Sequence, residues 1–183
     1  MASQGPLGPL TTVDDSSVGT QSWGTPNNAQ VSDAIYTTAT LLGGSGAVVE
    51  NSIKIVQGGT ISGTDKSTGA ALSLNTEAYT SYGSSSDLWG LNWLYTDINS
   101  STFGVAVAYN GNTATSHYLK ATNFGFSIPN SRVDGILAEV QAHYQTPGGD
   151  RVAGIDYVRI TVTYTPAGLT NIVSVSNIST LTF

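Results

Sequence analysis

The chain has 183 residues, of which 39% are hydrophobic and only 10% charged, and twelve acidic against six basic side chains give a net charge of -6. This length suits one domain, because a chain of this size can bury about 70% of the surface that it exposes when unfolded. The acidic balance argues against nucleic acid as a partner, since no basic face is available to neutralise phosphates. The absence of cysteine excludes disulfide scaffolds, thiol catalysis and thiolate metal sites.

The low charge leaves Ser, Thr, Asn and Gly to form most of the surface. Such a surface has few charges to desolvate on contact with another protein, which favours an assembly partner over a freely diffusing enzyme. Residues 1–10 have no positive n-region and no apolar core, and no run of about 18 apolar residues occurs in the chain. We therefore expect neither a Sec signal peptide nor a transmembrane segment, and no membrane partner.

Residues 1–20 contain Gly5, Pro6, Gly8 and Pro9 and offer few side chains to bury. They predict an extended N-terminal arm, either a disordered tail or a tether that orders on a neighbouring molecule. Residues 21–166 then form the predicted domain, and they begin with a turn at 23–29 that carries one large anchor, Trp23.

Short runs rich in β-branched and aromatic residues, separated by Gly, Asn and Pro, predict strands in this domain. We expect them over 33–42, 48–57, 77–82, 103–109, 116–120, 124–128, 136–144 and 155–165. In 103–109, Phe103 and Val105 alternate with small residues, which indicates an inward face. No segment has helical periodicity with capping signals. The class is therefore all-β, a single β-sandwich or jelly roll, with 167–183 as a C-terminal β-strand extension.

Turn signals connect these strands. Asn110-Gly111 predicts a type I′ hairpin, because that turn needs a positive φ at both central positions. Gly58-Gly59 predicts a second turn; the run 58–63 resembles a phosphate loop only loosely, since Thr64 stands where a lysine is needed and no helix follows. In the two last long strands, Glu139 and Gln141 alternate to the wet face, as do Tyr157 and Arg159.

Residues 84–99 hold two of the three tryptophans, in a pattern that fits neither alternation nor a helical face. We interpret this stretch as an ordered crossover folded onto the core. The predicted structural anchors are the large aromatic side chains Trp89, Trp93, Trp23, Phe124 and Phe126. The candidate partner contacts are apolar side chains near the two ends of the chain: Leu7, Leu10, Val173, Val175, Leu181 and Phe183.

Candidate catalytic residues are few. Paired carboxylates could serve glycoside hydrolysis, and Asp87, Asp97, Asp134 and Asp156 are the candidates, but each lies beside a turn or an apolar position where carboxylates commonly bind backbone amides. His117 and His143 could share a metal only if their strands are neighbours, and no third ligand is evident, so both are interpreted as ordinary surface histidines. We expect no enzyme, no catalytic or metal residue and no cofactor. Exposed tyrosine and tryptophan rings keep a carbohydrate-binding module open as the alternative.

Seven segments have distinctive amino-acid sequences: 14–20 (DDSSVGT), 23–29 (WGTPNNA), 84–99 (SSSDLWGLNWLYTDIN), 103–105 (FGV), 118–129 (YLKATNFGFSIP), 133–136 (VDGI) and 156–165 (DYVRITVTYT). In them the chain resembles a family of β-sandwich proteins found among tailed-phage virion proteins. The resemblance implies a virion component on the capsid or tail surface, with no catalytic residues to carry over.

The order of two blocks differs from the family pattern, because 48–114 here precedes 115–150. Such a rearrangement is physically tolerable if the exchanged units have adjacent ends. We therefore expect a non-enzymatic capsid decoration (cement) protein that binds the phage major capsid protein or another virion protein, with a homotrimer as its own assembly. The alternative is a carbohydrate-binding module on a phage tail or cell surface, with a glycan as its ligand.

Overall fold

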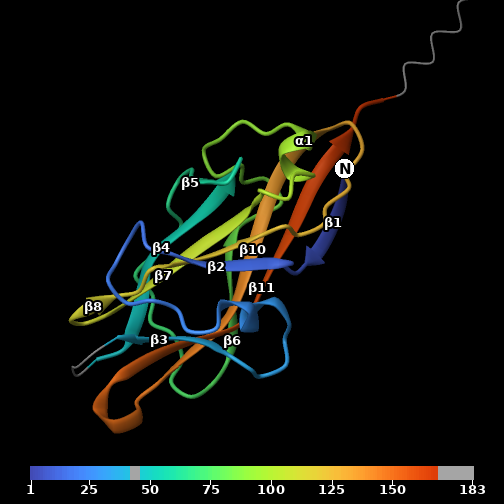
Figure 1. Ribbon diagram of the computed structural model, residues 1–183. Helices are drawn as coiled ribbons and strands as arrows, with labels where there is room; N and C mark the ends of the chain where they lie inside the picture. The colour runs from blue at the N-terminus through green and yellow to red at the C-terminus, as the bar shows by residue number, and fades with distance from the viewer. Residues whose placement is uncertain (42–45, 169–183) are drawn as a thin grey trace, which may run out of the picture.

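A computed structural model describes residues 1–41 and 46–168 and shows two antiparallel sheets packed face to face (Figure 1). Sheet A contains, in spatial order, β1 (Ala2–Leu7), β11 (Arg151–Pro166), β10 (Ser131–Gln145) and β6 (Ala78–Gly83), with β3 (Thr37–Leu41) paired to the first half of β11. Sheet B contains β2 (Thr11–Asp15), β9 (Tyr118–Thr122), β7 (Gly104–Gly111), β4 (Val48–Gln57) and β5 (Thr60–Ser62), with β8 (Ala114–Thr115) beside β7. The sequence-based prediction of an all-β sandwich is confirmed.

The helical turns of the described residues are short. They are η1 (Pro26–Gln30), α1 (Tyr95–Ile98) and η2 (Pro147–Gly149). No helix in the described part of the chain is both long and apolar enough to cross a membrane.

The core lies between the sheets, where inward side chains of β7 and β4 meet those of β10 and β11. The five predicted anchors, Trp23, Trp89, Trp93, Phe124 and Phe126, are all buried in this core. Phe103 joins three of them: its ring lies 5.4 Å from Trp93, 5.7 Å from Phe126 and 6.5 Å from Phe124, centroid to centroid. Offset and edge contacts of this kind stabilise the core beyond the apolar area that they bury.

The stretch 84–99 crosses from sheet A to sheet B between β6 and β7. Trp89 is fully buried, and its indole N–H donates to the Ile136 carbonyl at 3.0 Å. The indole of Trp93 donates to the Leu88 carbonyl at 2.9 Å. Both rings therefore face inward with their polar atoms satisfied, as a core position requires.

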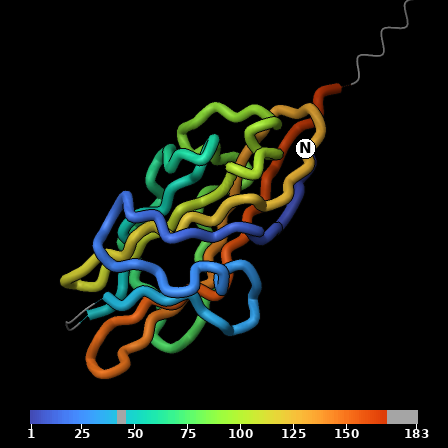
Figure 2. Tube along the Cα trace, in the orientation of Figure 1, coloured from blue at the N-terminus to red at the C-terminus, as the bar shows by residue number. Residues whose placement is uncertain are grey.

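The N-terminal segment differs from the expected arm. Residues 1–20 run along the body (Figure 2), and β1 pairs with β11 while β2 pairs with β9, so this segment supplies an edge strand to each sheet. Leu7 packs against the core. The sequence did not predict these edge strands, because an edge strand buries little apolar surface and needs few apolar residues.

The predicted Asn110-Gly111 hairpin is wrong in position. Both residues belong to β7, and Gly111 pairs with Ala114, so the turn falls on 112–113. Gly111 instead allows β7 to lie close to Leu41 of the opposite sheet, because a Cβ at Gly111 would lie 2.7 Å from the Leu41 Cβ. The Gly58-Gly59 turn is confirmed, since both residues have positive φ and link β4 to β5.

Two predicted strands are modified. The strand expected over 33–42 begins at Thr37, because Asp33 donates its backbone N–H to Asp156 and 31–36 form a loop. Residues 124–128 keep the predicted alternation, with Phe124, Phe126 and Ile128 buried, but they form no ladder. Side chains bind this backbone instead: Ile128 N–H donates to Asn99.

Candidate functional site

The four candidate carboxylates belong to different segments: Asp87 lies between β6 and α1, Asp97 in α1, Asp134 in β10 and Asp156 in β11. Each accepts hydrogen bonds from nearby groups: Asp87 from Lys66 (2.7 Å), Asp97 from the Leu94 backbone N–H (2.9 Å), Asp134 from Arg132 (2.8 Å) and Asp156 from Ser32 (3.0 Å). The hydrogen bond from Thr165 lowers the pKa of Asp134, although desolvation acts in the opposite direction. Three of the carboxylates bind backbone amides as expected: Asp97 accepts from Leu94, Asp87 also from Trp89, and Asp156 also from Asp33. Asp134 instead binds the side chains of Arg132 and Thr165.

The two histidines belong to different sheets. His117 lies between β8 and β9, and its Nδ1 lies 2.8 Å from Asp14. His143 lies on β10 and is only 4% exposed, so the interpretation of it as a surface histidine is wrong. It is buried because Gly154 on β11 and the ring of Tyr36 pack against it. Among the described residues no group of three or more His, Cys, Asp and Glu is arranged to hold a metal ion.

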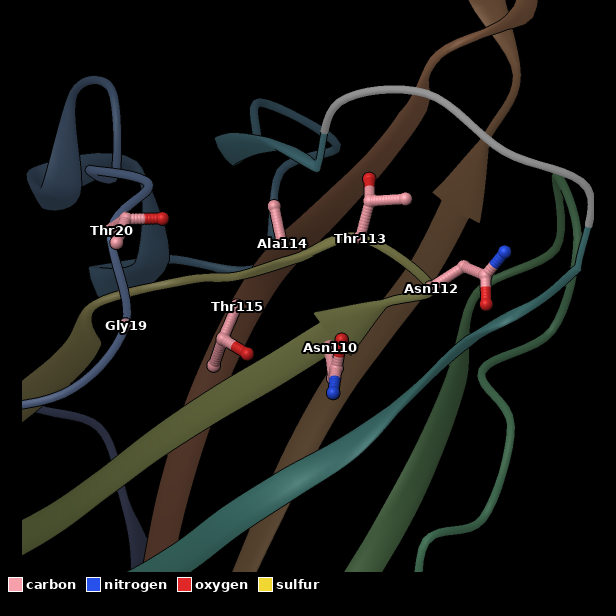
Figure 3. A pocket seen from close by; sticks show the side chains of 7 residues that line it. All are labelled: Gly19, Thr20, Asn110, Asn112, Thr113, Ala114 and Thr115. Atoms are coloured by element: carbon pink, nitrogen blue, oxygen red, sulfur yellow. The ribbon is translucent and has the colours of Figure 1, made fainter.

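A hollow of about 500 Å³ opens beside the β7–β8 hairpin (Figure 3). It is lined by small polar or aliphatic residues, namely Gly19, Thr20, Asn110, Asn112, Thr113, Ala114 and Thr115. None of these side chains is ionisable or aromatic. The hollow therefore has neither an acid–base group for chemistry nor a ring on which a ligand could stack.

The outer surface of sheet A carries a more organised layer, which we call the sheet A face. It consists of outward side chains of three adjacent strands: Tyr79, Glu139, Gln141, Tyr157 and Arg159. Arg159 binds Glu139 through Nε at 2.9 Å and Nη2 at 3.0 Å, and its guanidinium carbon lies 3.9 Å from the centre of the Tyr79 ring. These hydrogen bonds raise the pKa of Arg159, so the pair stays ionised.

Two loops border the sheet A face and are joined to it. Tyr36, from the loop 31–36, donates its hydroxyl to Glu77, which precedes β6. Gln141 donates to the other oxygen of Glu77 at 2.6 Å, and the Ser32 hydroxyl lies 3.0 Å from Gln141 Oε1. The hydrogen bond to Glu77 raises the pKa of Tyr36 to about 12. We call this arrangement of the loops 31–36 and 73–77 the loop clasp.

The loop clasp presents apolar side chains to solvent. Val31 is 60% exposed, Ile35 56% and Leu74 48%, and Tyr79 on the adjoining strand is 39% exposed. These are four of the eight large exposed apolar side chains among the described residues. Single exposed apolar residues are ordinary, but a group beside an ordered Tyr and Arg layer is typical of a protein contact surface.

The predicted partner contacts differ in their exposure and in whether the structure describes them. Leu10 is 67% exposed, whereas Leu7 is partly buried and packs against the core. Val173, Val175, Leu181 and Phe183 lie outside the described residues. Sequence alternation placed Glu139, Gln141, Tyr157 and Arg159 outward, but it could not place these side chains beside one another, because that depends on the register between strands.

The structure thus contains an ordered layer of polar and aromatic side chains on the sheet A face, bordered by the exposed apolar side chains of the loop clasp. Comparison of the chain with protein-family models, with curated proteins and with solved structures finds no match.

Proposed function

We propose that this chain is a structural virion protein of a tailed bacteriophage, a capsid decoration protein that binds the assembled shell, and that it is not an enzyme. The resemblance in the sequence suggests the virion, and the sheet A face with the loop clasp supports a role in protein binding. Tyr and Arg are enriched where proteins bind one another, and here Arg159 on β11 and Tyr79 on the edge strand β6 are held against each other before a partner arrives. Little ordering entropy then opposes association.

The proposal places the shell contact on the sheet A face rather than on the N-terminal segment. Residues 1–20 already pair within the sandwich, so detaching them would break both ladders. The loop clasp, by contrast, is exposed without any rearrangement. The proposed partner is the major capsid protein or another virion protein.

Co-sedimentation with expanded capsids tests this proposal. We expect the protein to pellet with the shell, and Ile35→Asp to weaken binding by about tenfold or more, because it puts a charge into the apolar part of the contact. Leu10→Asp is the matched control: Leu10 is similarly exposed but lies on the N-terminal segment, and its change should leave binding intact. Failure of the unmodified protein to pellet would overturn decoration, and loss of binding only in Leu10→Asp would move the contact to the N-terminus.

A carbohydrate-binding module is the second candidate, and Tyr79 is the observation that favours it. Its ring is 39% exposed and lies opposite Gln141 in the β6–β10 ladder, and an aromatic ring with a neighbouring amide can bind a sugar ring and its hydroxyls. Trp23 and Trp89 are buried and cannot stack on a ligand. A glycan array with Tyr79→Ala tests this candidate: binding that disappears in the folded variant would support it.

A further inference from the structure

The free edge of β6 has unpaired hydrogen-bonding groups whose residues can be identified from their neighbours on β10. Ile136 donates its N–H to Asp87 and accepts the Trp89 indole at its carbonyl, so both of its backbone groups point away from β11, toward the β6 side. Tyr144 likewise accepts from Asn75 and donates to Ser73 on that side. Alternate residues of a strand point the same way, so Ala138, Val140 and Ala142 also face β6.

This pattern decides which groups of β6 are bonded. Ala138 is paired with Tyr82, and Val140 with Thr80, so these β6 residues bind β10. The N–H and C=O groups of Tyr79 and Ser81 then point outward. Among the described residues no backbone or side-chain group binds them.

The other edges of the described sheets are protected. Gly5 and Pro6 interrupt β1, two aspartates end β2, and β5 has only three residues. Gly24 bonds to the outer side of β3 at Thr38, and the segment 64–72 bonds along β4. The β6 sequence AYTSYG has none of these features: it contains no proline, no charge and no register shift in its ladder. Proteins usually blunt such an edge or pair it.

We propose that β6 pairs antiparallel with β6 of a second copy, about a two-fold axis near Ser81, so that the two A sheets become one continuous sheet. When β6 pairs with β6 of a second copy, equivalent side chains of the two strands lie on the same face of the joined sheet. An isologous dimer needs this self-complementarity. Because β6 has no charged side chain, its pairing with itself places no like charges directly opposite each other. This inference is independent of the proposed capsid function, and it gives a dimer in place of the trimer expected from the resemblance.

Sedimentation equilibrium over a range of protein concentrations tests the oligomeric state. We expect a monomer–dimer equilibrium, and Ser81→Lys should raise its dissociation constant by about tenfold or more, because two lysines would face each other near the axis. Ser3→Lys is the matched control, since Ser3 is an exposed serine on β1, at the opposite edge of the same sheet. It should leave the equilibrium unchanged.

Amide hydrogen exchange identifies the paired edge itself. The Tyr79 and Ser81 amides should exchange rapidly in the monomer and become protected as the protein concentration rises, whereas those of Thr80 and Tyr82 should be protected throughout. A chain that stays monomeric at all concentrations, a trimer, or a dimer in which the Tyr79 and Ser81 amides stay unprotected would each overturn the proposal. Protection of these amides only on addition of capsids would instead assign the edge to a strand of the shell and would equally overturn self-pairing.

Discussion

His143 is a titratable side chain in surroundings that disfavour its charged form. Its ring packs edge-on against Tyr36 at 4.5 Å between centroids, its Nδ1 has no hydrogen-bond partner among the described residues, and Gly154 lies against its Cε1. Burial lowers the pKa of His143, although the carboxylates of Glu77 and Asp156 act in the opposite direction.

This environment predicts a loss of stability in mild acid. The unfolded chain binds the His143 proton near pH 6.5, but the folded chain binds it only at lower pH. The free energy of unfolding therefore falls as the pH drops below 6.5 toward the folded pKa. Urea unfolding between about pH 7.5 and 5.5, above the range in which carboxylates titrate, measures this slope.

The variant that isolates the effect is His143→Phe, which keeps a ring against Tyr36 and cannot titrate. We expect a flatter pH dependence than in the unmodified protein. His117→Gln is the control, because it removes the other histidine of the chain. An unchanged slope in His143→Phe would assign the pH dependence to other groups.

Among the elements, the crossover 84–99 depends on one glycine of β10. A Cβ at Gly135 would lie 2.2 Å from the Ser85 carbonyl carbon and 2.3 Å from the Ser86 nitrogen. Both are backbone atoms, which cannot move without shifting the whole segment. The crossover in turn places Trp89 in the core.

Gly135→Ala should therefore destabilise the protein by about 2 kcal/mol or more, since the clash involves backbone rather than a flexible side chain. Chemical denaturation with tryptophan fluorescence measures the loss and reports whether Trp89 and Trp93 stay in an apolar environment. Gly24→Ala is the control, because a Cβ there makes only ordinary contacts, the nearest at 3.7 Å. Equal stabilities of the two variants would contradict this role of Gly135.

The sequence predicts elements well where the signal is local. Phe103, Val105 and Val107 alternate and are buried on one side of the strand, and two adjacent glycines make the β4–β5 turn. Prediction from the sequence fails where a residue is required by a contact with a residue distant in the chain. Gly111 reads as a turn residue, but its small size is needed against Leu41, which comes from the other sheet and is 70 positions earlier in the chain.

The same limit applies to the candidate site. Outward alternation predicts that Tyr157 and Arg159 face solvent, yet the contact of Arg159 with Tyr79 depends on the pairing of three strands. The loop clasp depends on Tyr36 meeting Glu77 across 41 positions of sequence. No local pattern records such a contact, because it arises only once the sheet register is set.

At the scale of the whole molecule, the segment 48–111 has adjacent ends. Val48 is paired with Gly111, so the segment begins and ends on neighbouring strands of sheet B. Units whose ends are adjacent can be reconnected without changing the strand contacts. The segment 48–111 meets this condition at its own two ends.

The N-terminal segment connects the two sheets, because β1 completes sheet A and β2 completes sheet B. Leu7 packs on the core, and Gln4 accepts the Ser127 N–H at 3.0 Å, which holds the segment 124–128 in place. Removal of residues 1–10 would expose the edge of β11 from Ile160 to Tyr164 and leave the Ser127 N–H without this partner.

Deletion of residues 1–10 should therefore lower the free energy of unfolding by about 2 kcal/mol or more, because it removes the β1–β11 ladder and the partial burial of Leu7. The opened β11 edge should also promote aggregation, which light scattering during a thermal melt would detect. Removal of Met1 alone is the control, since its side chain is 83% exposed and contributes little to packing. A deletion variant as stable and soluble as the full chain would show that residues 1–10 act as a detachable arm, and it would return them to the list of candidate contacts with a shell.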